Sequence, residues 1–180
     1  GEDFHRKSVY KRMGIENYES MSLDTPETME YVRDLRDNFV DRVLSNSTDH
    51  LGEQFIEQYA KFVSPDTVEL DDGTRIKANS FVLATGSTPI VPAPWEKFGD
   101  RIVTTDAFFE LEDLPGSMAV IGLGVIGLEI GQSLSRLGVE VTGFDMMEQI
   151  GGITDPDVNK SAVDIINKAF PIHLGAAAEI

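Results

Sequence analysis

Three glycines and one carboxylate form the pattern in this chain that is best suited to chemistry. Gly122, Gly124 and Gly127 are spaced as G-x-G-x-x-G between an apolar run and an amphipathic stretch, and Asp145 follows 18 residues after the last glycine. A strand that turns on such glycines into a helix binds the pyrophosphate of a dinucleotide, because the first N–H groups of the helix and its dipole attract negative charge. The pattern therefore predicts a site for the ADP half of a dinucleotide. The alternative is a glycine-rich turn without a ligand.

Each glycine has a separate expected role. Gly122 should permit the tight turn, Gly124 should let the pyrophosphate approach the backbone, and Gly127 should let the helix lie close to the strand. The full set of residues predicted to bind the nucleotide is Gly122, Leu123, Gly124, Val125, Ile126, Gly127, Asp145 and Met146.

Asp145 indicates which dinucleotide is bound. At the tip of the second strand, a carboxylate accepts hydrogen bonds from the hydroxyls of the adenosine ribose and repels a 2′-phosphate. No arginine lies between residues 137 and 180 to receive such a phosphate, and Glu148 adds negative charge nearby. The pattern predicts NAD rather than NADP.

The elements that position this site are an alternating series of strands and helices. Residues 118–121 form an apolar strand, residues 126–137 an amphipathic helix closed by Gly138, and residues 139–144 a second strand. Asp155 and Pro156 then begin a second helix, and a third strand starts at residue 172. This order is βαβαβ, one mononucleotide-binding half of a doubly wound α/β sheet.

The preceding part of the chain has a different pattern. A short helix is predicted over residues 4–13 and an amphipathic helix over residues 25–44, with Thr25 as N-cap and Pro26 in its first turn. Asp72-Gly73 between two strand-like runs predicts a hairpin with a tight primed turn. Residues 80–85 read as a continuous apolar strand covered on both faces. Prolines are frequent over residues 88–117, which predicts a boundary between two units.

Composition excludes several classes of function. The net charge of −16 argues against nucleic-acid and anionic-membrane partners, and the absence of cysteine excludes disulfides and thiolate metal sites within this chain. No run is long and apolar enough for a membrane span, and no signal-peptide core is present, so we expect a cytoplasmic protein. The three histidines, His5, His50 and His173, are far apart and are interpreted as structural or surface residues. Both ends of the chain suggest a fragment.

Several motifs together resemble one family. Ala84-Thr85-Gly86, Thr105-Asp106-Ala107, Leu114-Pro115 and the run VIGLGVIGLE from Val120 to Glu129 occur in the order and spacing of the flavin-dependent pyridine nucleotide–disulfide oxidoreductases. The chain looks most similar to the dihydrolipoamide dehydrogenase branch. The resemblance is strong from residue 80 onward and diffuse before residue 53. Two departures are Val125, where some relatives carry tyrosine, and Gly143-Phe144-Asp145, where an aliphatic pair and a glutamate are more usual.

The resemblance implies cofactors and residue roles. Residues 1–115 would be the last part of a first FAD-domain segment, made of helices and a β-meander, and residues 116–180 the first half of an NAD-binding domain. Ala84, Thr85 and Gly86 would contact FAD. Glu129 would pair with a lysine beside the flavin ring, although a charge on the exposed side of a helix is the simpler alternative.

The resemblance also implies an activity for a longer parent protein. It would be a homodimeric enzyme that moves electrons between NAD(H), FAD and a dithiol or disulfide such as dihydrolipoamide, with a lipoyl carrier domain as a candidate partner. The redox cysteine pair and the catalytic histidine would lie outside this chain, so the chain alone should be inactive and should not hold FAD. The alternatives are an NADH oxidase or ferredoxin-reductase-like flavoenzyme without redox cysteines, and a non-catalytic NAD-binding module.

Overall fold

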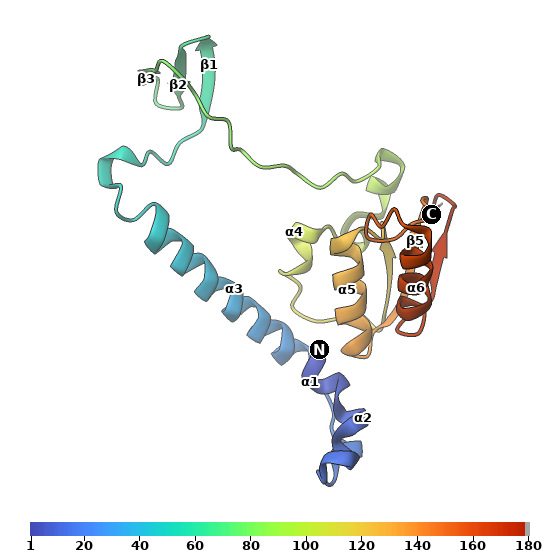
Figure 1. The fold of residues 1–180 in the computed structure, drawn as a ribbon. Helices are drawn as coiled ribbons and strands as arrows, with labels where there is room; N and C mark the ends of the chain where they lie inside the picture. The colour runs from blue at the N-terminus through green and yellow to red at the C-terminus, as the bar shows by residue number, and fades with distance from the viewer. Residues whose placement is uncertain (179–180) are drawn as a thin grey trace. The chain divides into compact units, whose positions relative to one another are not determined.

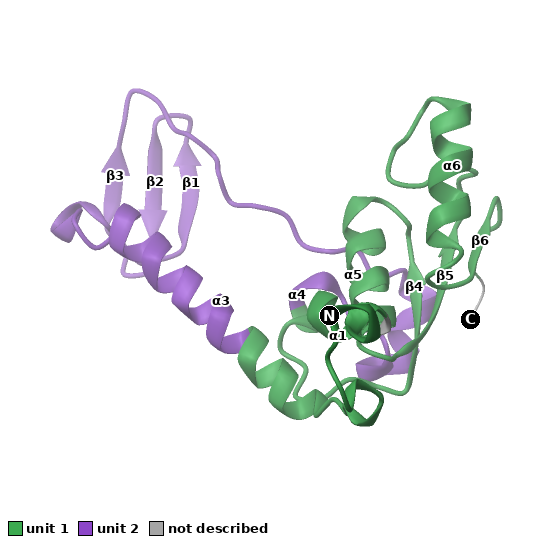
Figure 2. Ribbon diagram, turned by 60° about the horizontal axis from the view of Figure 1, so that its bottom comes forward, with its two compact units in different colours: residues 1–32, 107–180 green, residues 33–106 purple. Residues whose placement is uncertain are grey.

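The computed structural model describes residues 1–178. These residues form two compact units (Figure 2): residues 33–106 make one, and residues 1–32 with those from 107 onward make the other. This division reflects contacts within the chain. It does not test the domain boundary predicted at residue 115, which stays a prediction.

The unit that contains the glycine-rich turn is a three-stranded parallel sheet with two crossover helices (Figure 1). Its elements are β4 (Ser117–Ile121), α5 (Val125–Arg136), β5 (Glu140–Asp145), α6 (Pro156–Ile166) and β6 (Ile172–Leu174). The strand order is β4-β5-β6, with Val120 opposite Gly143 and Gly143 opposite Ile172. The predicted βαβαβ half of an α/β sheet is confirmed.

Two glycines allow the helices and the sheet of this unit to pack around one aromatic ring. A Cβ atom added at Gly131 on α5 would lie 2.8 Å from Cζ of Phe170, and one added at Gly143 on β5 would lie 2.9 Å from Cδ2 of Leu123. Phe170 and Leu123 are both buried in the core. Gly131 is therefore a site of close packing, and Gly143 stands where a larger strand residue would displace the core.

Helix α6 begins as the sequence predicts. Asp155 is its N-cap, and the carboxylate accepts hydrogen bonds of 3.0 Å from the N–H groups of Asp157 and Val158. Pro156 occupies the first helical position, where its missing N–H is no loss. This cap fixes where the connection from β5 enters the helix.

The N-terminal segments are helical. Short helices α1 (Glu2–His5), α2 (Lys7–Tyr10) and η1 (Lys11–Met13) end at Gly14, which has the left-handed φ of 74° expected of a helix terminator. The next helical turn is η2 (Tyr18–Ser20).

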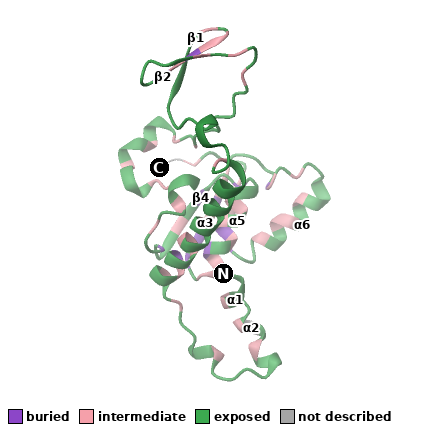
Figure 3. Cartoon of the chain, turned by 90° about the vertical axis from the view of Figure 1, so that its left-hand side faces the viewer, coloured by how far each residue is buried: buried purple, intermediate pink, exposed green. Residues whose placement is uncertain are grey.

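The long helix α3 (Thr25–Ser47) follows, and its predicted cap is wrong by one residue. The carboxylate of Asp24 accepts a hydrogen bond of 3.1 Å from the N–H of Glu27, whereas the hydroxyl of Thr25 donates to the carboxylate of Asp113. Asp24 is thus the N-cap, and Thr25 is the first helical residue. Met29, one turn further, is only 2% exposed and belongs to the same core as Leu114. Figure 3 shows buried residues near β4 and α5, whereas α3 is mostly exposed along its length.

The unit of residues 33–106 contains an antiparallel meander. Its strands are β1 (Ala60–Ser64), β2 (Thr67–Leu70) and β3 (Arg75–Lys77), paired in the order β1-β2-β3, and η3 (Gly52–Gln54) precedes them. The predicted hairpin at Asp72-Gly73 is present, but its turn is not a primed two-residue turn. Leu70 donates its N–H to the carbonyl of Thr74 across a three-residue loop, and only Gly73 in that loop has a positive φ, of 83°. A primed turn of type I′ would require a positive φ at two successive residues.

The predicted strand over residues 80–85 is wrong. The structure assigns no strand there, and the side chains of Val82 and Leu83 are 91% and 75% exposed. A strand forms only when its backbone N–H and C=O groups find partners in a neighbouring strand, and none of the strands in the described part of the chain pairs with this segment. The segment continues to η4 (Ala93–Arg101) and α4 (Thr105–Phe108).

Among the described residues, no helix combines the length and the apolar character that crossing a membrane requires.

Candidate nucleotide-binding site

The glycine-rich turn leaves β4 and enters α5 with the geometry of an anion site. Gly122 has a φ of 93° and donates its N–H to the carbonyl of Phe144 at 2.8 Å, so the turn starts from the edge of the parallel ladder. Gly124 is the N-cap of α5 and, being a glycine, supplies no side chain to accept the N–H groups of the first helical turn. Those groups, from Val125 and Ile126, have no acceptor within the helix and are available to an anion.

The three glycines of the motif differ in what the fold requires of them. Gly122 needs its positive φ, and a Cβ at Gly127 would lie 1.9 Å from the carbonyl oxygen of Gly122, which the backbone cannot tolerate. Gly124 is different: its φ is −65°, and a Cβ there would meet no atom within 4 Å. Packing and backbone conformation therefore explain two glycines and leave the third unexplained by the fold.

Asp145 lies at the end of β5 and binds the glycine-rich turn directly. Its Oδ2 accepts a hydrogen bond of 2.6 Å from the N–H of Leu123, and its Oδ1 accepts one of 2.8 Å from the N–H of Met147. No local pattern indicates the contact with Leu123, because the two residues are 22 positions apart. Each carboxylate oxygen has two lone pairs, so both oxygens retain the capacity to accept a further hydrogen bond. The carboxylate can hold the turn and still present negative charge to a ribose.

The backbone of Leu123 is held at both its N–H and its carbonyl. Its N–H donates to Asp145, and its carbonyl accepts a hydrogen bond of 2.7 Å from the N–H of Gly151. The Leu123 side chain is fully buried, so this residue contributes backbone rather than side chain to the site. Gly151, in the connection between β5 and α6, is a site residue that sequence reasoning missed, because nothing local links it to residue 123.

The remaining predicted nucleotide residues are exposed at the same edge of the sheet. Val125 and Ile126 open α5, and Met146 directly follows Asp145 with 69% of its surface exposed. Their side chains are available to line a bound adenosine or pyrophosphate. The structure therefore brings together all eight residues predicted from the motif, in the turn between β4 and α5, at the start of α5, and at the end of β5 with the residue that follows it.

The residues predicted to lie beside FAD are all exposed. Glu129 is on an exposed part of α5, which fits either of its two interpretations. Ala84, Thr85 and Gly86 are exposed in the extended segment of the other unit, and Gly86 has a φ of 70°. Their contact with FAD stays a prediction.

All three histidines of the chain are exposed. His173 on β6 is exposed and its ring stacks on that of Phe144, with centroids 5.1 Å apart. His5 and His50 are exposed. Within residues 1–178, no group of three histidine or carboxylate side chains has the arrangement of a metal site.

Comparison with known proteins places this geometry in a family. The family model described as pyridine nucleotide-disulphide oxidoreductase matches residues 6–178. The mitochondrial dihydrolipoyl dehydrogenase of Schizosaccharomyces pombe is 36% identical over 135 residues, which cover 69% of this chain and 26% of that protein. A soluble pyridine nucleotide transhydrogenase of Mycobacterium bovis is 30% identical over 105 residues, covering 56% of this chain and 22% of that protein. The chain thus spans about a quarter of the length of these relatives.

Two solved structures have similar folds. A HOCl-induced flavoprotein disulfide reductase of Escherichia coli superposes with a TM-score of 0.70 at 20% identity, over 98% of this chain and 39% of that one. A ferredoxin reductase of Rhodopseudomonas palustris superposes with a TM-score of 0.56 at 25% identity, over 73% of this chain and 37% of that one. The first likeness extends over both units of the chain.

Proposed function

The chain belongs to the pyridine nucleotide-disulphide oxidoreductase family, and from that premise we propose that residues 116–180 bind the ADP half of NAD. The observation that carries the proposal is Gly124. The fold explains Gly122 and Gly127, but neither packing nor φ requires a glycine at Gly124. A pyrophosphate lying on the first N–H groups of α5 would require the space that a side chain at residue 124 would occupy. If the turn bound no ligand, neither packing nor backbone conformation would explain why residue 124 is a glycine.

The preference for NAD over NADP is supported by Asp145. Its carboxylate lies at the tip of β5, bonded to the turn, and has lone pairs left for ribose hydroxyls. A 2′-phosphate at the same place would meet this negative charge. The basic side chain on the following helix, Lys160, is bound to Asp164 at 2.7 Å, so its charge is already paired.

For the whole protein we propose an NAD-dependent flavoenzyme acting on a dithiol or disulfide such as dihydrolipoamide. Support comes from the family match and from the relative named dihydrolipoyl dehydrogenase. When bound, the nicotinamide and flavin cofactors supply hydride and electron transfer. The residues of this chain would bind and orient them, through the turn and Asp145 for NAD, and through Ala84, Thr85, Gly86 and Glu129 for FAD. A homodimer, a lipoyl carrier partner, a cytoplasmic location and the inactivity of the chain alone remain predictions.

A flavoenzyme without a reactive disulfide is the second candidate. The observation in its favour is the likeness to a ferredoxin reductase at a TM-score of 0.56 and 25% identity. A protein that contains this chain should reduce NAD with dihydrolipoamide as donor if the first candidate is right. Oxidation of NADH by ferricyanide or oxygen without any activity on dihydrolipoamide would favour the second.

The NAD site itself is tested with two matched glycine substitutions. Gly124→Val places a side chain in the expected pyrophosphate position, whereas Gly116→Val adds the same side chain ahead of β4, where a Cβ also meets no atom within 4 Å. Titration of NADH fluorescence should show that Gly124→Val raises the Kd about 100-fold or more, because at least two hydrogen bonds to a charged group are lost. Gly116→Val should bind as the unaltered chain does. Equal binding by both variants would contradict the proposal.

A further inference from the structure

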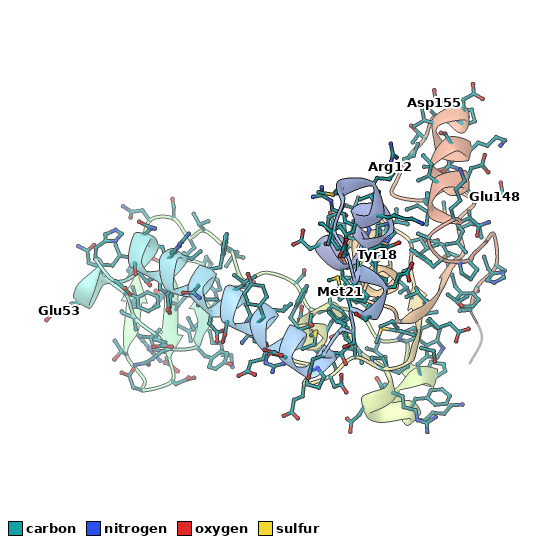
Figure 4. The ribbon with its side chains drawn as sticks, turned by 90° about the horizontal axis from the view of Figure 1, so that it is seen from below. Arg12, Tyr18, Met21, Glu53, Glu148 and Asp155 are labelled. Atoms are coloured by element: carbon teal, nitrogen blue, oxygen red, sulfur yellow. The ribbon has the colours of Figure 1, made fainter. Side chains whose placement is uncertain are left out.

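A single asparagine on α6 holds the connection that follows Asp145. Asn159 accepts a hydrogen bond of 3.0 Å from the N–H of Ile150 at its Oδ1, and its Nδ2 donates one of 3.2 Å to the carbonyl of Glu148. Its own N–H is satisfied within the helix start, by the carbonyl of Asp155 at 2.9 Å. Both the oxygen and the nitrogen of the side-chain amide therefore bond to the connection between β5 and α6. Figure 4 labels Glu148 and Asp155, which lie on the segment from β5 to α6.

The connection that Asn159 holds is bonded in turn to the glycine-rich turn. Ile150 is fully buried, and the next residue, Gly151, donates its N–H to the carbonyl of Leu123 at 2.7 Å. Leu123 donates to Asp145 from the same residue. Two hydrogen bonds, joined by the covalent step from Ile150 to Gly151, thus connect the amide of Asn159 to the carbonyl that precedes Gly124.

We propose that Asn159 is a positioning residue for the NAD site, an inference that rests on the proposed function above. Its amide fixes residues 148–151 so that Gly151 and Asp145 hold the Leu123 peptide from its two sides. That peptide sets the direction of the N–H groups at the start of α5, on which pyrophosphate binding depends. Asparagine suits the role because a side-chain amide both accepts from an N–H and donates to a C=O, as a backbone peptide does.

The chain offers a matched control on the same helix segment. Asn167 follows α6, and its Oδ1 accepts a hydrogen bond of 3.2 Å from the N–H of Ile172 at the beginning of β6. It makes the same kind of side-chain contact with the backbone, but to a residue outside the series that reaches Leu123. Asn159→Leu and Asn167→Leu each remove an amide and keep a side chain of similar size.

Two measurements on the full 180-residue chain test the inference. In hydrogen exchange without nucleotide, Asn159→Leu should lose protection at the Gly151 N–H, and Asn167→Leu should not. In NADH titrations, Asn159→Leu should raise the Kd about tenfold, the change expected from the net loss of one to two hydrogen bonds, with Asn167→Leu unchanged. Asn159→Ala, which adds no bulk, should behave as Asn159→Leu, and circular dichroism of each variant establishes that it is folded.

The outcomes separate this inference from the function on which it rests. Unchanged exchange at Gly151 in the Asn159 variants would overturn the inference and leave NAD binding untouched. So would an unchanged Kd for NADH, or an equal loss of affinity in the Asn159 and Asn167 variants. If the unaltered chain does not bind NADH at all, both the proposed function and the inference are overturned.

Discussion

Substitution of Asp145 by asparagine is the sharpest test of how this site chooses its nucleotide. The carboxylate accepts the N–H of Leu123 at 2.6 Å and the N–H of Met147 at 2.8 Å, one on each oxygen. An asparagine has one acceptor oxygen, so its NH₂ group would face one of these two N–H donors. Asp145→Asn therefore removes the charge offered to the ribose and also weakens the attachment of the turn.

The expected magnitude follows from these two contacts. A hydrogen bond to a charged group contributes about 1.5–3 kcal/mol, and Asp145 is only half-buried, so we take the lower part of that range. The free energy of unfolding should fall by about 1–2 kcal/mol. Loss of the charged acceptor should raise the Kd for NADH by roughly 5–30-fold, whereas NADPH loses a repulsion and should bind no more weakly than before. The ratio of the two Kd values should shrink by about tenfold.

The assay is a fluorescence titration of both nucleotides, with Asp155→Asn as the control. Asp155 accepts two backbone N–H groups on one oxygen, Oδ1, and asparagine caps helices as well as aspartate does, so that substitution changes the net charge equally and leaves its contacts in place. Asp155→Asn should therefore leave the NADH/NADPH ratio unchanged. If Asp145→Asn also leaves it unchanged, the carboxylate does not engage the ribose and the assignment to NAD is refuted.

Two further predictions concern stability. Gly127→Ala forces a methyl group against the carbonyl of Gly122, so chemical denaturation should show a loss of about 3 kcal/mol, with Gly116→Ala close to neutral as the control. The pKa of Asp66 in the meander is lowered from its ordinary value of 3.8, first by the hydrogen bond with Lys77 and then by those with Ser64 and Thr67. A lowered folded-state pKa contributes stability that is present above pH 3.8 and is lost as the pH falls through the folded-state value. The protection of β2 amides, measured against their intrinsic exchange rates, should therefore fall in that acidic range, and Asp66→Asn should abolish this pH dependence. An identical pH profile in the variant would argue against the ion pair.

The parts of the fold that sequence predicted are those fixed by local chemistry. The G-x-G-x-x-G spacing, an apolar run before it and a helical period after it specify β4, the turn and α5 from adjacent residues alone. Asp155-Pro156 specifies the start of α6 for the same reason, since a carboxylate cap and a proline act within one helical turn. A glycine inside a helix, such as Gly131, also indicates close packing from sequence alone, because it destabilises the helix unless another element needs the space.

The parts that sequence missed depend on residues far apart in the chain. Both Asp24 and Thr25 are good N-cap residues, and the choice between them depends on Asp113, which accepts the hydroxyl of Thr25 from 88 residues away. Asp145 reads as a ligand for ribose, but its bond to Leu123 spans 22 residues and becomes visible only in the folded chain. The sequence alone would suggest Asp145→Arg as a way to switch nucleotide specificity. That substitution would also leave the N–H groups of Leu123 and Met147 without their acceptor.

Residues 80–85 have the apolar composition of a buried strand but do not form one. Their apolar side chains satisfy the pattern of a buried strand, yet Val82 and Leu83 are exposed and the backbone joins no sheet, whereas Phe81 packs edge-to-face on Phe62 with centroids 4.9 Å apart. Composition describes what a segment would gain from burial, but pairing depends on a second strand at the right distance. The glycine-rich turn lies between elements that are consecutive in the chain, β4, α5 and β5, so the strand that pairs with β4 is close in sequence. That difference explains why the glycine-rich turn and the elements around it were predictable from the sequence and the conformation of the segment around Ala84-Thr85-Gly86 was not.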